Sequence, residues 1–148
     1  MRVISYREDG AARLGIVVED QVIDVASADP RLPATLDEII AKGALDRLAA
    51  IAAAAPVAGR RALADVELAL PIARPGKIFC LGLNYLDHVR EGPFAEQGHP
   101  ALFMRSADSL VASGAPIVRP LVSEQLDWEA ELAVVIGRRA KHLAPENA

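Results

Sequence analysis

The stretch RVISYREDGAARLGIVVEDQVIDV, residues 2–25, contains three short runs rich in β-branched residues, separated by polar residues. Asp9-Gly10 is a typical turn pair, and the polar segment 19–21 separates the second run from the third. Strands joined by such short turns pair with their neighbours in the antiparallel sense. We therefore predict a small antiparallel β-meander at the N-terminus.

The residues that follow predict helices and then a domain boundary. Residues 35–55 carry apolar residues at helical spacing, with Thr35 as N-cap, Glu38 as its capping-box partner and Gly43 as a break between two short helices. Residues 65–70 alternate as a strand does, and the next six residues, PIARPG, hold two prolines and a glycine. We predict an N-terminal α+β module over residues 1–70.

Residues 71–148 predict a second region of short strands. KIFCLGL (77–83) and ALFMR (101–105) are typical of strands, and NYLDHVRE (84–91) of a short helix. The fold class we predict is α+β, with a small meander and helix module followed by the first part of a mostly antiparallel β domain. The final PENA is typical of a helix start, so we expect this chain to be part of a longer protein.

Composition excludes several classes of partner. The net charge is −4 with acidic and basic residues mixed along 148 residues, which predicts neither nucleic-acid nor anionic-lipid binding. No apolar stretch reaches the length that a membrane span needs, and the charged N-terminus is not a secretory signal. Cys80 is the single cysteine, which excludes an internal disulfide. We expect a cytoplasmic protein.

The segment QLDWEAELAVVIG, residues 125–137, places three carboxylates at alternate positions, Asp127, Glu129 and Glu131. If residues 126–136 form a strand, these side chains share one face, and Trp128 packs on the other. That face is either the wet side of an amphipathic strand or a site for a hard cation such as Mg²⁺, Mn²⁺ or Ca²⁺. The wholly apolar LAVVIG that follows favours an enclosed position, because it is typical of a strand covered on both sides.

Two further positions carry candidate chemistry. His88 and Glu91 are three residues apart, so a helix brings them onto one surface. Such a pair is either a solvated surface contact or a general base, in which the carboxylate orients the imidazole. Arg105 ends a predicted strand and is either a surface residue or a clamp for a substrate carboxylate.

The segments KIFCLGLNYLDHVRE, ALFMRSADSL and DWEAELAVVIGRRAKHL together resemble the fumarylacetoacetate hydrolase family. The resemblance covers residues 71–148 and depends on the order and spacing of the three segments. It implies an FAH-like β-roll, with Glu129 and Glu131 as two ligands of Mg²⁺ or Mn²⁺, Ca²⁺ being possible. It also implies that His88 and Glu91 activate the attacking water.

The resemblance extends to the remaining parts of the site. Arg105, where many members have lysine, would bind the substrate carboxylate. The third metal ligand would be an aspartate about thirty residues beyond Glu131, whereas this chain ends at residue 148. The implied arrangement of the full-length protein is a homodimer.

The implied activity is hydrolysis of a C–C bond in an acylpyruvate or fumarylacetoacetate-like 1,3-diketo acid. Two alternatives use the same metal site: decarboxylation of a 2-oxo acid, and isomerisation or hydration of a 2-hydroxy-dienoic diacid. A third belongs to another class, in which the chain is a catalytically incomplete fragment or a non-enzymatic binding module and its acidic face is solvated.

Overall fold

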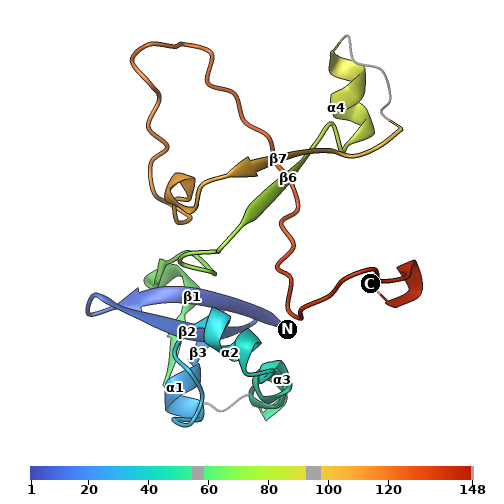
Figure 1. Cartoon of the computed structure of the whole chain (residues 1–148). Coiled ribbons are helices and arrows are strands. Elements are labelled where there is room, and N and C mark those ends of the chain that lie inside the picture. Colours follow the sequence, from blue (N-terminus) through green and yellow to red (C-terminus); the bar gives the residue numbers. More distant parts are fainter. Residues whose placement is uncertain (55–58, 93–97, 148) are drawn as a thin grey trace. The chain divides into compact units, whose positions relative to one another are not determined.

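The computed structural model describes residues 1–54, 59–92 and 98–147 (Figure 1). The chain divides into two compact units, one of Met1–Ile72 with Ala112–Ala148 and one of Ala73–Val111. The division after Ile72 falls within the proline- and glycine-containing segment 71–76. Residues 91–100, EGPFAEQGHP, have the composition of a loop, and 93–97 of them lie outside the described residues.

The first unit contains a five-stranded sheet. Its strands are β1 (Arg2–Glu8), β2 (Ala11–Val18), β3 (Gln21–Asp24), β4 (Arg60–Ala62) and β5 (Glu67–Leu68). Their order in the sheet is β4-β3-β2-β1-β5, and every neighbouring pair is antiparallel. The turn between β1 and β2 has positive φ at Asp9 (49°) and Gly10 (77°), which matches the twist of a tight hairpin.

Three helices follow or interrupt these strands: α1 (Val25–Ala28), α2 (Leu36–Ala41) and α3 (Leu45–Ala54). Gly43 separates α2 from α3 with a φ of 62°, a conformation that glycine adopts without strain. The capping box predicted for Thr35 and Glu38 is wrong in its hydrogen bonds. Thr35 is the N-cap of α2 but makes no side-chain bond to the backbone, because its Oγ1 hydroxyl donates to the Glu38 carboxylate at 3.2 Å.

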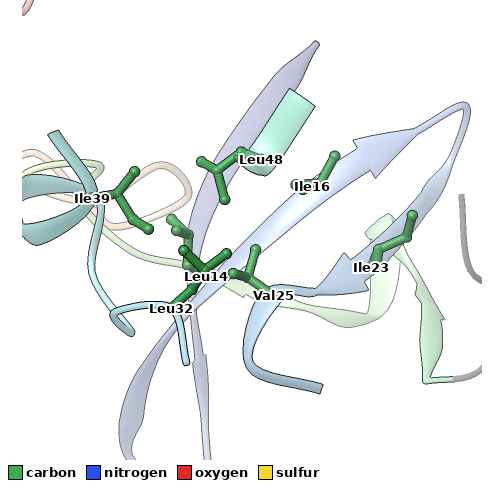
Figure 2. Close-up of a cluster of buried hydrophobic side chains, with 7 residues drawn as sticks. All are labelled: Leu14, Ile16, Ile23, Val25, Leu32, Ile39 and Leu48. Atoms are coloured by element: carbon green, nitrogen blue, oxygen red, sulfur yellow. The ribbon is translucent and has the colours of Figure 1, made fainter. Parts of the chain in front are cut away.

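A buried apolar cluster lies where the sheet meets these helices (Figure 2). Alternation along β2 points Leu14 and Ile16 to one face and Val17 to the other. The Leu14 face carries the main cluster, which consists of Leu14, Ile16, Ile23, Val25, Leu32, Ile39 and Leu48. Tyr6, Val17 and Val22 form a second buried cluster. Both faces of the central strands are therefore packed.

Asp24 is the one buried carboxylate of the described residues, with 2% of its surface exposed. It ends β3 and caps α1 by accepting the Ser27 backbone N–H at 2.7 Å. Tyr6 donates to it at 2.7 Å and Arg13 at 2.6 Å. Burial would raise the pKa of Asp24, but the hydrogen bonds from Arg13, Ser27 and Tyr6 outweigh it and lower the pKa to about 2. Burial, with the Asp24 bond, raises the pKa of Tyr6 to about 12.

The second unit contains an antiparallel pair of strands and one helix. The elements are β6 (Ile78–Gly82), α4 (Leu86–Glu91), β7 (Ala101–Arg105) and the short 3₁₀ turn η2 (Ala107–Ser109). The register pairs Ile78 with Arg105 at one end and Gly82 with Ala101 at the other. The strands and helix predicted from residues 77–105 thus occur at those positions.

The predicted strand at 126–136 is wrong for this structure. Apart from the 3₁₀ turn η3 (Pro145–Asn147), the described residues from 112 onward contain neither helix nor strand. Leu132 is 82% exposed and Trp128, expected in a core, is 81% exposed. A strand forms only where a neighbour accepts its backbone hydrogen bonds, and no described segment pairs with this one.

Taken together, the chain is a mixed α/β structure with antiparallel sheets and few helices. Among the residues that the structure describes, no helix has the length and hydrophobicity required to span a bilayer.

Candidate functional site

The helix α4 positions the predicted histidine–glutamate pair. Its first turn is closed by the Val89 N–H, which donates to the Tyr85 carbonyl at 3.1 Å, and Val89 is buried. His88 is half-buried in the last turn of the helix, and Glu91 is its exposed final residue. Both therefore lie on one short element at a spacing of three residues, at which helical side chains are neighbours.

Arg105 ends β7 and is exposed. Its guanidinium carbon lies 5.9 Å from the centroid of the Phe103 ring, two residues earlier on the same face of the strand. Stacking on an aromatic ring holds a guanidinium while its N–H donors stay accessible to a carboxylate. The arrangement is therefore compatible with binding an acidic ligand.

Glu129 and Glu131 lie in the irregular segment that follows residue 112, and both are exposed. Beside them, the Asp127 carboxylate accepts the backbone N–H of Trp128 at 2.8 Å. The expected enclosure of these carboxylates is not found, because the apolar residues that follow, such as Val134 at 75%, are exposed as well.

Carboxylate pairs can contribute to a metal site only in combination with other ligands. Within residues 1–54, 59–92 and 98–147, no three or more histidine, cysteine, aspartate or glutamate side chains are grouped so that they could hold an ion. Within the described residues, Glu129 and Glu131 would thus supply carboxylate oxygens from two side chains, fewer ligands than Mg²⁺ or Ca²⁺ requires.

The predicted site residues fall in different parts of the structure. His88, Glu91 and Arg105 belong to the unit Ala73–Val111, whereas Glu129 and Glu131 belong to the other unit. The structure brings His88 and Glu91 together on α4 and places Arg105 on a neighbouring element of the same unit.

Sequence reasoning did not identify Leu83, which lies between β6 and α4 with a φ of 55°. Leucine adopts a left-handed backbone only rarely, so no sequence pattern indicates it. The residue joins the strand to the helix that carries His88 and Glu91.

The sequence of this chain is similar to that of a known protein family and of several known proteins. Residues 77–148 match the family model described as fumarylacetoacetate (FAA) hydrolase C-terminal. This match confirms the predicted resemblance to the fumarylacetoacetate hydrolase family, and the matched range contains every predicted site residue. The mitochondrial oxaloacetate tautomerase fahd2 of Xenopus laevis is 33% identical over 100% of this chain and 48% of its own length. The human mitochondrial oxaloacetate tautomerase FAHD2A is 36% identical over 86% of this chain and 40% of its own.

The fold is also similar to that of a solved hydrolase. The maleylpyruvate hydrolase of Sphingobium sp. SYK-6, crystallised with manganese(II) and pyruvate, matches with a TM-score of 0.51 and 27% identity. The match covers 74% of this chain and 38% of that one. This chain therefore spans about half or less of the length of the relatives it matches.

Proposed function

Because residues 77–148 of this chain belong to the fumarylacetoacetate hydrolase family, we propose that the protein cleaves a C–C bond in an acylpyruvate-like 1,3-diketo acid with the help of a divalent cation. The observation that carries this proposal is the similarity to a hydrolase whose crystals held manganese(II) together with pyruvate, a 2-oxo acid. Pyruvate is also a product of hydrolysing acetylpyruvate, the simplest substrate of the proposed class.

The donors for the cation are Glu129 and Glu131, whose carboxylate oxygens suit Mg²⁺ or Mn²⁺. Since the described residues supply no group of three ligands, the complete site needs at least one more ligand than these two. When bound, the cation supplies Lewis-acid stabilisation of the negative charge that develops on the substrate oxygens.

His88 and Glu91 perform the proton transfer in this proposal. An imidazole nitrogen of His88 takes a proton from water, and the Glu91 carboxylate orients the ring. The hydroxide adds to the distal carbonyl carbon of the substrate, and the bond from that carbon to the central carbon breaks. The electron pair goes to the central carbon, which takes up the proton from His88. Acetylpyruvate and water thus give acetate and pyruvate.

Arg105 binds the substrate carboxylate in this proposal. Its guanidinium presents N–H donors in a plane that matches a carboxylate, and the contact with Phe103 limits the rotamers that it samples. Binding at this end fixes which of the two carbonyl groups faces the attacking water.

The test is turnover of acetylpyruvate by the intact gene product with Mn²⁺ or Mg²⁺, following pyruvate release. Loss of groups that merely support metal ligands costs about 10- to 100-fold. Glu129→Ala, which removes a proposed ligand, should therefore lower kcat/KM by more than about 100-fold. Glu124→Ala, at an exposed glutamate of the same irregular segment, is the matched control and should retain activity. Full activity of Glu129→Ala would remove the metal assignment.

The His88–Glu91 assignment has its own test. Glu91→Gln keeps the size of the side chain and removes the charge that orients the imidazole, so it should lower kcat while KM changes little. His88→Gln should lower kcat by about 100-fold or more, the usual contribution of a general base. A kcat unchanged in Glu91→Gln would separate Glu91 from the proton transfer.

A second function is tautomerisation of oxaloacetate. It is supported by the similarity to the two oxaloacetate tautomerases that are 33% and 36% identical to this chain. It needs proton transfer at a 2-oxo acid without C–C cleavage, and the same residues could perform it. Mass spectrometry of the products distinguishes the two, because tautomerisation leaves the carbon skeleton intact.

A non-catalytic binding module is the alternative from another class. Calorimetric titration of this chain with Mn²⁺ addresses it. Two carboxylates without a third ligand should bind weakly, with a Kd above about 1 mM. Tight binding of one ion per chain would contradict the incomplete ligand set.

A further inference from the structure

Leu83 adopts a left-handed backbone at the point where the chain leaves β6 for α4. Its φ is 55°, and the residue before it, Gly82, makes the last pair of the β6–β7 ladder with Ala101. The conformation is disfavoured for leucine, because its β-carbon approaches the following carbonyl oxygen. Leucine also lacks the polar side chain by which asparagine or aspartate offsets that cost.

Tight hairpins explain positive φ at Asp9 and Glu19 but not at Leu83. Asp9, with a φ of 49°, and Glu19, with a φ of 55°, lie in the short turns of the β1–β2 and β2–β3 hairpins. Turns of that kind favour positive φ. Leu83 instead lies between the strand β6 and the helix α4, so its conformation is not required by hairpin geometry. Strained backbone of this kind is typically retained at functional sites.

The connection from β6 to α4 consists of residues 83–85 only. Tyr85, the N-cap of α4, has extended backbone (φ −115°, ψ 127°), so the reversal of backbone handedness in this connection occurs at Leu83. In a connection this short, each backbone dihedral angle contributes strongly to the direction in which the helix leaves the strand. The helix then carries His88 and Glu91 within nine residues of Gly82.

We propose that Leu83 is a positioning residue, whose left-handed backbone sets the direction of α4 from β6 and thereby places His88 and Glu91 for proton transfer. The proposal rests on the proposed function for its consequence in catalysis. Its structural part, the orientation of α4 relative to β6, is independent of any reaction.

Three substitutions separate backbone conformation from side-chain packing. Leu83→Asn replaces leucine with a residue that tolerates the left-handed region. Leu83→Gly permits that region but also frees the connection, and Leu83→Val disfavours it strongly because valine is branched at the β-carbon. We expect Leu83→Asn to keep kcat within about threefold of the unsubstituted protein, and the other two to lose about tenfold or more, with KM changed less than about twofold.

Glu19→Gly is the matched control, since it removes a positive-φ side chain of nearly the same φ from a hairpin in the other unit. It should leave kcat unchanged. A role for Leu83 in apolar packing alone predicts the opposite order, with Leu83→Asn the most damaging and Leu83→Val the least. That order, or wild-type kcat in both Leu83→Gly and Leu83→Val, would overturn the proposal.

Residual dipolar couplings measured by NMR test the structural part when no turnover is found. In Leu83→Gly, the couplings of the α4 amides should shrink relative to those of β6 and β7, and in Leu83→Asn they should keep their ratio. A failure of the proposed function alone would leave these couplings as expected. Unchanged α4 couplings in Leu83→Gly would refute the positioning role itself.

Discussion

Replacing Asp24 with asparagine should remove a large part of the stability of the five-stranded sheet. Asp24 is 2% exposed, and its carboxylate oxygens accept five hydrogen bonds. Two come from Arg13 at 2.6 and 3.0 Å, one from the Tyr6 hydroxyl at 2.7 Å, and two from the N–H and hydroxyl of Ser27 at 2.7 Å each. Asparagine has the same shape but one accepting oxygen in place of two.

The expected cost has two parts. The pKa of Asp24 falls from 3.8 to about 2, so the charged form is stabilised by about 2 kcal/mol in the folded protein, at about 1.4 kcal/mol per unit. In the variant, the asparagine NH₂ group replaces an accepting oxygen and faces N–H and O–H donors, so it has no acceptor there. A buried unsatisfied group of this kind costs about 1–3 kcal/mol. The sum is about 3–5 kcal/mol, a large fraction of the about 5–15 kcal/mol that stabilises a typical domain.

The contribution of Asp24 to the free energy of unfolding decreases as the pH falls. Because the pKa of Asp24 is lower in the folded than in the unfolded chain, its charge-linked stabilisation is fully present above pH 4 and is lost as pH falls through about 2. Urea unfolding followed by far-ultraviolet circular dichroism at pH 7 and near pH 2 measures this. The difference in unfolding free energy between the two proteins should narrow by about 2 kcal/mol at the lower pH.

Asp108→Asn is the matched control, because Asp108 forms an exposed pair with Arg74, at 3.3 Å, and should contribute about 0.5 kcal/mol or less. A cost below about 1 kcal/mol for Asp24→Asn at pH 7, or a cost that does not change with pH, would refute the reasoning.

Two further substitutions test the packing of the first unit. Gly15→Ala should destabilise the first unit by about 2 kcal/mol in urea unfolding, because a β-carbon at Gly15 would lie 2.5 Å from Val22 Cγ1 and 3.2 Å from Tyr6 Cε1. An alanine variant of unchanged stability would show that the Val22 side chain moves away without cost. Thr35→Ala should cost less than about 0.5 kcal/mol, since the Thr35 side chain makes no bond to the helix backbone. A loss of about 1 kcal/mol would indicate that its hydroxyl does cap the backbone of α2.

The elements predicted correctly are those set by short-range patterns. The strands β1–β3 occur where alternation and turn residues place them, and Gly43 separates α2 from α3 at positive φ. The elements that sequence reasoning missed are short and lack periodicity. The strand β4 consists of RRA, residues 60–62, and forms because it pairs with β3. The predicted strand 126–136 has the alternating pattern, but no described segment pairs with it as a strand. Without backbone hydrogen bonds from a neighbouring strand, the pattern does not produce a strand.

The sequence alone determined the kinds of site residue and their spacing, together with the family that they indicate, because these are properties of neighbouring positions along the chain. Only the tertiary structure decided that Asp24 is buried among Tyr6, Arg13 and Ser27, and that Leu83 takes a left-handed backbone. Both depend on contacts between residues far apart in the chain or on the path required between two elements. Burial and backbone strain are set by which segments meet, and local propensity does not encode that.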